Sequence, residues 1–322
     1  MSAVRVGIIG ASGYTGVELL RLCAQHPQFE VVYATGDTRA GTLASSLYPS
    51  LTAAFPDLVF EAFDEDRVAG LDLVFLGLPH EASLALAPRL VGRVGCVVDL
   101  SAAYRLKDAS LYPTWYGFEH DQPDLLAAAV FGLLALEPLV AAGLVDPHGL
   151  VVDSITGVSG AGRALKDDSL FCAVDEDLRA YGLLDHRHTP EMEQAIGMSL
   201  HETTCRVLFT PHLAPLNRAM LVTCYAKPAK SVTTESLLAT LASRYRGEPF
   251  VVVRPTSPST KAALGTNTAF ITARYDQRTD TVIAVCALDN LCKGASGGAV
   301  QSANVALGLD ESAGLQKVGL YP

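Results

Sequence analysis

A glycine-rich turn between a strand-like run and a helix-like run constrains the fold of this chain most strongly. The turn Gly10–Gly16 (GASGYTG) follows the β-branched run Arg5–Ile9 and precedes Val17–Gln25, in which apolar residues recur at helical spacing. Glycines at such a junction permit a tight turn and let backbone N–H groups approach a phosphate at the helix N-terminus. The spacing is GxxGxxG rather than GxGxxG, so the strand–turn–helix context carries the prediction of a dinucleotide-binding turn.

The rest of the first third continues this alternation. Strand-like runs occur at Glu30–Ala34, Leu73–Leu78 and Val94–Leu100, and His80–Leu90 can form one of the helices between them. Leu73–Leu78 is almost wholly apolar, as expected for a strand buried on both faces. Strands alternating with helices predict an α/β fold with a Rossmann-type, doubly wound parallel sheet.

The pattern changes from about Leu150, where strand-like runs predominate and Thr234–Arg244 is the clearest helix. The runs are Val151–Thr156, Cys205–Thr210, Met220–Ala226, Pro249–Val253, Phe270–Tyr275 and Thr281–Ala287. They predict a second, α+β domain with a mixed or antiparallel sheet, and the helix-compatible Gly294–Leu307 is expected to return to the first domain. The length of 322 residues agrees with two domains. We expect residues 1–149 with 290–322 to form the dinucleotide-binding domain, and residues 150–289 to form the second, substrate-binding domain.

Composition excludes several classes of function. The net charge of −10 and the pI of about 5.2 argue against general nucleic-acid binding, which needs a basic face. The seven cysteines show no CxxC pair and no metal-ligand spacing, so a reduced cytoplasmic protein without a targeting segment is expected. Leu125–Val145 is apolar and long enough to cross a bilayer, but Glu137 and Pro138 within it argue against a membrane span.

The residues after the second strand-like run are expected to contact the ribose of the dinucleotide. Asp37 would bind a 2′-hydroxyl and favour NAD, whereas Thr38 and Arg39 would hold a 2′-phosphate and favour NADP. An acidic residue beside the arginine leaves both cofactors open, and we favour NADP. The simpler alternative is a solvated loop of charged residues.

Two further segments carry side chains suited to chemistry. His186–Glu191 (HRHTPE) combines two imidazoles for acid–base work with a guanidinium that can bind a carboxylate or phosphate. An HxH pair could instead bind a metal, but no third ligand lies at local spacing, so no metal is expected. The alternative is a surface loop with two ordinary histidines. Gly157–Arg163 (GVSGAGR) could bind an anion through backbone N–H groups, although a structural turn is the simpler interpretation.

Seven motifs taken together resemble the N-acetyl-γ-glutamyl-phosphate reductase family, whose relatives include aspartate-semialdehyde dehydrogenase. They run in the family's order over nearly the whole chain: GASGYTG at Gly10–Gly16, LPH at Leu78–His80, DLSAAYRL at Asp99–Leu106, GVSGAGR at Gly157–Arg163, HRHTPEMEQ at His186–Gln194, FTPHLAPLNR at Phe209–Arg218 and DNLCKGASGGAVQSAN at Asp289–Asn304. Single motifs of this kind are only suggestive, whereas seven in order are specific.

The resemblance implies an enzyme of arginine biosynthesis that uses NADPH to reduce an acyl phosphate, N-acetyl-γ-glutamyl phosphate, to an aldehyde. In the family a thiolate forms a thioester, phosphate leaves, and hydride reduces the thioester. The resemblance implies His188 as the acid–base group, and the substrate-binding residues Arg105, Arg187, Glu191 and His212. The cofactor-binding residues that it implies are Gly10, Ser12, Gly13, Tyr14, Thr15, Gly16, Thr38, Arg39, Pro79, Ser101 and Asn290. It also implies a homo-oligomer formed through the second domain's sheet. A relative acting on a carrier-bound aminoadipyl phosphate would share much of the pattern.

The chain departs from the family at the nucleophile. The family carries its cysteine in a segment resembling NPGCYPT, and no such segment occurs here, because the sequence runs directly through Leu133 and Leu134. A length of roughly 20 residues, about one strand with its loop, is missing. Cys172 is expected in the core with the other cysteines, and Cys292 is a poor surrogate nucleophile.

Three interpretations follow. The chain derives from an active parent that has the segment, or it truly lacks the segment and at most binds NADP as a pseudoenzyme. A generic NADP-binding protein is the third, and the HRHTPE and GVSGAGR matches argue against it.

Overall fold

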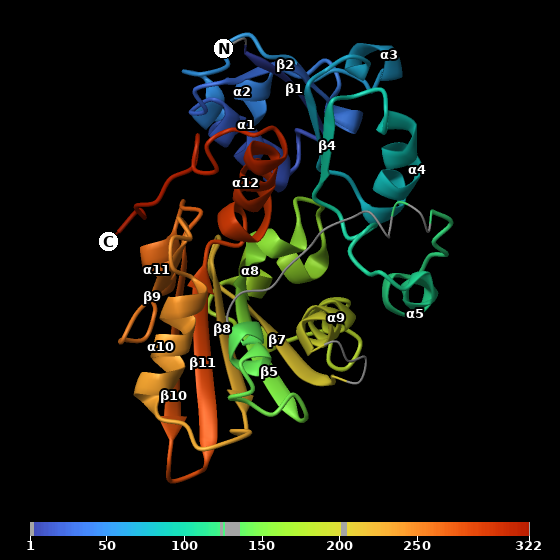
Figure 1. The fold of residues 1–322 in the computed structure, drawn as a ribbon. Coiled ribbons are helices and arrows are strands. Elements are labelled where there is room, and N and C mark those ends of the chain that lie inside the picture. Colours follow the sequence, from blue (N-terminus) through green and yellow to red (C-terminus); the bar gives the residue numbers. More distant parts are fainter. Residues whose placement is uncertain (1–2, 123–124, 126–135, 201–204, 322) are drawn as a thin grey trace. The chain divides into compact units, whose positions relative to one another are not determined.

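The computed structural model describes residues 3–122, 125, 136–200 and 205–321, and the chain divides into two compact units (Figure 1). Unit 1 comprises Met1–Tyr104, Gly162–Ala164 and Leu291–Gln316. Unit 2 comprises Arg105–Ala161, Leu165–Asn290 and Lys317–Pro322. Each unit is described in turn.

Unit 1 is built on a four-stranded sheet in the order β2-β1-β3-β4, in which every neighbouring pair is parallel. The strands are β1 (Val4–Ile9), β2 (Phe29–Ala34), β3 (Leu73–Leu76) and β4 (Cys96–Asp99). The helices are α1 (Tyr14–Cys23), α2 (Ala44–Leu47), α3 (Glu65–Val68), α4 (His80–Leu90) and α12 (Gly297–Ala306). The predicted parallel α/β sheet is confirmed.

Burial explains why these segments form this sheet. All four residues of β3 are buried, which agrees with its uninterrupted apolar sequence. Helix α1 buries Leu19, Leu20 and Leu22, and α12 packs against α1 and β4 from the far end of the sequence. The last helix therefore belongs to unit 1, as its helix-compatible pattern led us to expect.

Unit 2 contains a seven-stranded mixed sheet in the order β6-β7-β5-β8-β11-β10-β9. The strands are β5 (Leu150–Gly157), β6 (Arg179–Ala180), β7 (Val207–Ala214), β8 (Met220–Ala226), β9 (Val251–Val253), β10 (Ala269–Asp276) and β11 (Thr281–Leu288). The pairs β5–β7 and β9–β10 are parallel, and the other four pairs are antiparallel. The predicted second domain with a mixed sheet is confirmed.

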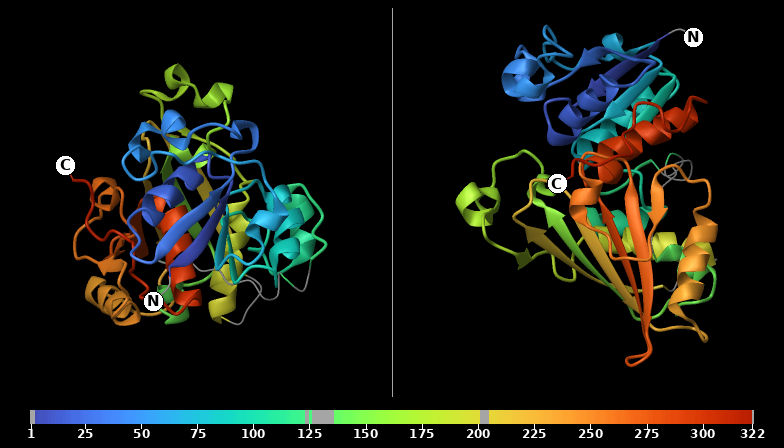
Figure 2. Two further views of the ribbon diagram at one scale, coloured as in Figure 1. Left: turned by 90° about the horizontal axis from the view of Figure 1, so that it is seen from above. Right: turned by 90° about the vertical axis from the view of Figure 1, so that its left-hand side faces the viewer.

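The helices of unit 2 are α5 (Tyr112–Tyr116), α7 (Glu137–Ala141), α8 (Phe171–Val174), α9 (His188–Leu200), α10 (Thr234–Arg244) and α11 (Thr260–Ala263). Helices α7, α9 and α10 lie on one face of the sheet, as the right-hand view of Figure 2 shows. Helix α10 packs on β9 and β10, α9 packs on β7, and α7 contacts both helices. Alternate strand residues such as Val152, Phe209 and Ile271 point into this core.

Helix α9 begins at His188, within the segment His186–Glu191 for which a surface loop with two ordinary histidines was the alternative interpretation. The expectation that Cys172 lies in the core is wrong, because its side chain is exposed on α8, a helix of one turn. The junction Leu133–Leu134 and most of the apolar stretch around it lie outside the described residues. Within the described part, no helix is long and apolar enough to cross a membrane.

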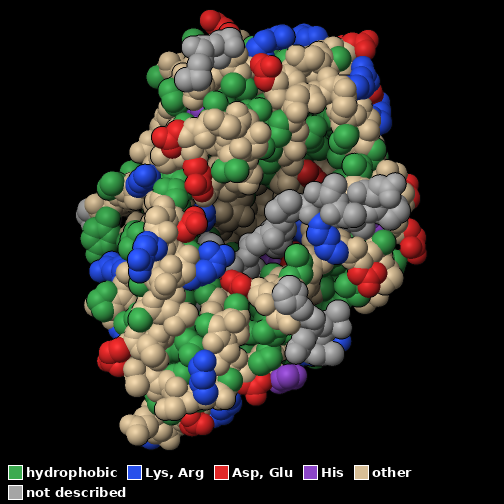
Figure 3. All heavy atoms as spheres, viewed as in Figure 1, with side chains coloured by type: hydrophobic (Ala, Val, Ile, Leu, Met, Phe, Trp, Pro, Cys, Tyr) green, Lys and Arg blue, Asp and Glu red, His purple; other side chains and the backbone are tan. Residues whose placement is uncertain are grey.

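The charged side chains on the surface agree with the composition. On the face shown in Figure 3, Lys and Arg side chains are interspersed with Asp and Glu rather than gathered into one basic patch.

Candidate functional site

The glycine turn of unit 1 has two positions that only glycine can occupy. Gly10 has φ +86°, and a Cβ on it would lie 2.4 Å from the Gly77 carbonyl oxygen. A Cβ on Gly16 would lie 2.5 Å from Ala11 Cα and 2.5 Å from the Gly10 carbonyl oxygen. Both distances are far below any ordinary contact, so these glycines are required for the turn and for packing α1 against it.

Gly13 differs, because the protein itself leaves room for a side chain there. A Cβ on Gly13 would meet only the Gly10 carbonyl oxygen, at an ordinary 3.6 Å. Gly13 is the N-cap of α1 and offers no side-chain cap, and the first helical bond runs from Val17 N to Gly13 O at 2.9 Å. The backbone N–H groups of Tyr14 and Thr15 lie before Val17 in the first turn of α1. They are at the N-terminal end of the helix, where the helix dipole is positive. The open position and these amides fit a dinucleotide diphosphate.

The turn is tied to the end of β2, where the ribose is expected. Thr35 Oγ1 accepts from Gly10 N at 3.0 Å, and Ser12 Oγ donates to Gly36 O at 3.1 Å. Thr38 and Arg39 follow in an exposed 3₁₀ turn. The predicted phosphate turn and the predicted ribose loop therefore lie side by side within unit 1.

The other residues of unit 1 with an expected cofactor role follow the next two strands. Pro79 is the N-cap residue of α4 after β3, and Ser101 follows β4. Because the strands are parallel, their carboxyl ends share the edge of the sheet that carries the glycine turn. Ser101 Oγ donates to Asp99 Oδ2 at 2.7 Å and accepts from Ala103 N at 3.0 Å, so this side chain also braces its own loop.

Asn290 belongs to unit 2, and both ends of its amide have partners there. Its Nδ2 donates to Ser159 Oγ at 3.0 Å, and its Oδ1 accepts from Ala219 N at 2.6 Å. The Gly157 amide in turn donates to Ala219 O at 2.9 Å. Asn290 thus braces the second glycine-rich loop, a role that its sequence motif does not predict.

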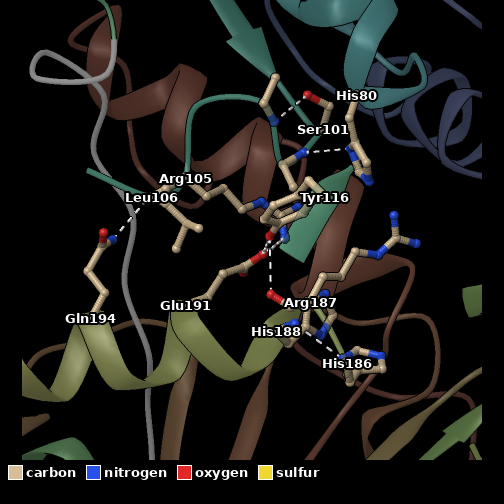
Figure 4. Close-up of polar contacts among 12 residues, drawn as sticks. His80, Ser101, Arg105, Leu106, Tyr116, His186, Arg187, His188, Glu191 and Gln194 are labelled. Carbon is tan, nitrogen blue, oxygen red and sulfur yellow. Dashed lines mark hydrogen bonds and ion pairs between the residues drawn. The ribbon is translucent and has the colours of Figure 1, made fainter. Parts of the chain in front are cut away.

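A buried carboxylate on α9 is the centre of the candidate substrate site in unit 2 (Figure 4). Glu191 is 4% exposed, and its Oε2 lies 3.2 Å from Arg105 Nη1. The Tyr116 hydroxyl donates a short hydrogen bond to Glu191 Oε1 and lies 3.3 Å from Arg187 O. Burial, followed by the charge of Glu191, raises the pKa of Tyr116, so the phenol stays protonated as the donor.

Neighbouring residues hold Arg105 in place from both sides. Gln194, one turn beyond Glu191 on α9, donates to Arg105 O at 2.9 Å and accepts from Lys107 N at 2.6 Å. The hydroxyl of Tyr112 accepts from Leu106 N at 3.1 Å. Arg105 therefore has a fixed backbone and a fixed partner, which suits a cation that orients an anionic substrate.

The two histidines lie at the start of α9. Their rings are 4.7 Å apart in an edge-on arrangement, and His186 Nδ1 accepts from His188 N at 3.2 Å. Burial, His188 and Arg187 lower the pKa of His186 to about 4, and burial lowers the pKa of His188. Both rings are therefore neutral near pH 7, and a neutral imidazole can accept a proton.

The sequence-predicted substrate residues are not all brought together. His188, Glu191 and Arg105 form one cluster with the backbone of Arg187, whose side chain is exposed. The Phe209 ring on β7 lies 5.1 Å from the His186 ring. His212 is three residues further along the same strand, so the His212 side chain points to the opposite face of the sheet. Its buried Nδ1 has no hydrogen-bond partner among the described residues.

Sequence reasoning missed Tyr116 and assigned no role to Gln194. The spacing of Gln194, three residues after Glu191, could have placed both on one helix face once α9 was recognised as a helix. Tyr116 carries no comparable signal, because its segment YPTWY fits no functional pattern.

All seven cysteines lie in the described part of the chain, and burial raises the pKa of Cys23, Cys96, Cys205 and Cys224. Cys23, Cys205, Cys224, Cys286 and Cys292 are buried, Cys96 is partly buried and Cys172 is exposed. Burial raises the pKa of Cys23 and of Cys224 to about 12. Such thiols are poor nucleophiles near neutral pH. The described residues include no cluster of three His, Cys, Asp or Glu side chains that could hold a metal ion.

Comparison with known proteins first defines the class. Residues 5–142 match the semialdehyde dehydrogenase NAD binding domain, and residues 128–290 match the semialdehyde dehydrogenase dimerisation domain. The fold is similar to that of aspartate semialdehyde dehydrogenase II from Vibrio cholerae complexed with ASA, with TM-score 0.68 and 15% identity, covering 95% of this chain and 99% of that one. The Candida albicans aspartate semialdehyde dehydrogenase with NADP gives TM-score 0.64 at 15% identity, covering 94% and 98%.

More similar sequences define the family. The N-acetyl-γ-glutamyl-phosphate reductase of Pelobacter propionicus is 42% identical over 348 residues, which covers 99% of this chain and 100% of the relative. That of Pseudomonas putida is 41% identical over 347 residues, with the same coverage. The chain belongs to the N-acetyl-γ-glutamyl-phosphate reductase family, and the resemblance seen in its motifs is confirmed.

Proposed function

We propose that this protein is built for the NADPH-dependent reduction of N-acetyl-γ-glutamyl phosphate to N-acetylglutamate 5-semialdehyde and phosphate. The observation that carries the proposal is the Arg105–Glu191–His188 cluster within a chain 42% identical to such a reductase over its whole length. In the proposed division of labour, unit 1 binds the dinucleotide and unit 2 binds the acyl substrate. The expected domains, 1–149 with 290–322 and 150–289, correspond to these units except that residues 105–149, Asn290 and residues 317–322 lie in unit 2 and residues 162–164 lie in unit 1.

The residues of unit 2 divide the remaining tasks. Arg105, held by Glu191 and Gln194, binds the anionic part of the substrate. With the nucleophile segment present, His188, neutral at pH 7, would accept the proton of the attacking thiol and return it to the sulfur when the thiohemiacetal formed by hydride transfer releases the aldehyde. Bound NADPH supplies the hydride. In unit 1 the Gly10–Gly16 turn holds the diphosphate, and Thr38 and Arg39 select NADP.

The proposed reaction also needs a thiolate that forms the thioester, and no cysteine of this chain is suited to that covalent step. Reduction through a thioester needs a thiolate near the acyl carbon, and the described cysteines are buried, weakly acidic or outside the cluster. The matched length of 348 residues in the Pelobacter propionicus relative exceeds the 322 residues of this chain, which supports the absence of a segment. A catalytically inactive NADP-binding protein is therefore the second candidate.

Restoring the segment distinguishes the two candidates. The assay measures NADPH formation from N-acetylglutamate semialdehyde, NADP and phosphate. The unmodified chain is expected to show no turnover, because without the thioester there is no acyl group that can accept the hydride. A variant that carries the nucleophile segment of a relative between Leu133 and Leu134 is expected to gain activity. The same insertion with its cysteine replaced by serine is the control.

Two outcomes would contradict the proposal. Turnover of the unmodified chain near that of a full-length relative would contradict the loss of the covalent step, and Cys292→Ser would then test the surrogate thiol. Failure of the restored chain to turn over, while it binds NADPH and folds, would contradict the proposed substrate. Carrier-bound aminoadipyl phosphate is then the substrate to test.

Assembly and location belong to the same proposal. The face of the unit 2 sheet opposite α9 and α10 carries partly exposed apolar residues, including Leu208, Leu221 and Tyr225. A face of this kind supports a homo-oligomer formed through the sheet. We assign the protein to the cytoplasm because its seven cysteines form no disulfide.

A further inference from the structure

Tyr48 lies beside the glycine turn and contacts a residue from a distant part of the sequence. Its hydroxyl donates to Ser12 O at 2.7 Å. The guanidinium of Arg163 lies over its ring, with Cζ 5.8 Å from the ring centroid. Arg163 ends the second glycine-rich loop, and its segment Gly162–Ala164 belongs to unit 1 although both flanking stretches belong to unit 2.

Arg163 and Arg39 differ from four other arginines of unit 1 in their electrostatic surroundings. Among the residues that the structure describes, neither forms an ion pair with Asp or Glu. The paired arginines are Arg21 with Glu18, Arg67 with Glu61, and Arg89 and Arg93 with Glu65. Both Arg163 and Arg39 lie near enough to Tyr48 to oppose the rise in its pKa that burial causes. Two uncompensated guanidinium groups beside one tyrosine form a site for an anion.

We propose that Arg163 joins Arg39 in binding the 2′-phosphate of NADP(H), with Tyr48 positioning the Arg163 guanidinium. The inference rests on the proposed cofactor and adds Arg163 and Tyr48 to its site. The ribose loop carries Arg39, and Ser12, which binds Tyr48, also bonds to that loop through Gly36 O. A phosphate monoester carries a charge of about −1.5 to −2 at pH 7, so a second guanidinium matches the second negative charge.

The 2′-phosphate fits this position better than the diphosphate does. The diphosphate already has the amides at the start of α1 and the open position at Gly13. NAD lacks the 2′-phosphate, so a residue devoted to that group contributes to NADPH affinity alone. Arg163 is thus a specificity-determining residue, and its contribution can be measured without catalysis.

The experiment measures dissociation constants of NADPH and NADH by fluorescence titration, without acyl substrate, for the full chain and its variants. Arg163→Met is expected to weaken NADPH binding about 10- to 100-fold, the range of a hydrogen-bonded charge pair, and to change NADH binding less than about twofold. Arg163→Lys keeps the charge but loses the bidentate fork, so its loss is expected to be smaller. Tyr48→Phe, which removes the hydroxyl bonded to Ser12, is expected to weaken NADPH binding a few-fold.

Arg5→Met is the matched control. Arg5 is an exposed arginine of unit 1, it forms no ion pair among the described residues, and it lies at the amino end of β1, whereas the glycine turn follows the carboxyl end. Arg5→Met removes one positive charge, as Arg163→Met does, and is expected to leave NADPH affinity unchanged. Thermal melts of each variant identify folding defects, and Arg163→Lys provides the test if Arg163→Met is unstable.

Two results overturn the inference. One is an Arg163→Met protein that binds NADPH as tightly as the unchanged chain does. The other is an equal loss for NADPH and NADH, which would assign Arg163 to the diphosphate. An unchanged chain that binds neither nucleotide contradicts the proposed function itself, so the two failures are distinguishable.

Discussion

The glycine turn of unit 1 and the Glu191 cluster of unit 2 are organised in opposite ways. The turn is seven consecutive residues, and its shape follows from contacts of Gly10 and Gly16 with backbone atoms. The cluster joins Arg105 to Glu191 across 86 residues and Tyr116 to Glu191 across 75. The first site depends on local sterics, whereas the second depends on which distant segments the fold brings together. Changes to the two sites should therefore have different consequences.

The largest expected effect is in the turn. In Gly16→Ala the new Cβ would lie 2.5 Å from Ala11 Cα, which the backbone can relieve only by moving α1. We expect a loss of about 3 kcal/mol in the free energy of unfolding, measured by urea denaturation. Gly13→Ala is the control, because its Cβ meets only Gly10 O at 3.6 Å. It should fold normally and yet weaken NADPH binding, and equal destabilisation by the two changes would contradict a steric role specific to Gly16.

The cluster provides the second test. Glu191→Gln removes the carboxylate charge from the ion pair with Arg105, in which the Glu191 side chain is 5% exposed and the Arg105 side chain is 25% exposed. The expected loss is about 2 kcal/mol, below that of a fully buried pair because Arg105 retains some contact with water. Arg206→Met breaks the Arg206–Glu193 pair of α9, where the Arg206 side chain is 75% exposed. It should cost less than about 1 kcal/mol, so similar losses would show that burial does not distinguish the pairs.

A third test uses pH. His186 has a folded-state pKa of about 4, lowered by burial, His188 and Arg187 from the ordinary 6.5. The neutral ring therefore stabilises the folded state fully above pH 6.5, and this contribution is lost as the pH falls towards 4, because the unfolded chain binds the proton more readily. In His186→Gln the acid-induced loss of stability between pH 6.5 and 4 should be smaller by about 1 kcal/mol. Urea midpoints measured across this range check it, and parallel curves for the two proteins would contradict it.

The smallest expected effect is a stabilisation. Ala219 adopts φ +117°, in the backbone region that favours glycine, while its N–H bonds to Asn290. In the turn Gly10–Gly16 no residue carries this backbone strain, because the position with positive φ is occupied by Gly10. Ala219→Gly should raise the stability by about 1 kcal/mol through relief of strain. Ala273→Gly, in the buried middle of β10, is the control and should lower it by a similar amount.

The sequence predicted most elements because their patterns are local. The strand Met220–Ala226 and the helices His80–Leu90 and Thr234–Arg244 have the expected bounds, and the other predicted strands differ only at their ends. The short edge strand β6 (Arg179–Ala180) was not predicted. Helix α9 was missed because His186–Glu191 was interpreted through its chemistry rather than its spacing. Cys172 was misplaced because the apolar residues before it, Leu170 and Phe171, are themselves exposed.

The sequence by itself determined the class of the fold and the motif that identifies the family. A turn built from adjacent glycines needs no distant partner, and the order of seven motifs is already present in the linear chain. Only the tertiary structure decided which side chains meet: Tyr116 with Glu191, Arg163 with Tyr48, and His212 on the opposite face of β7 from the residue that contacts His186. The physical reason is that side-chain hydrogen bonds and ion pairs act over a few ångströms, so they depend on the packing of segments that the sequence holds far apart.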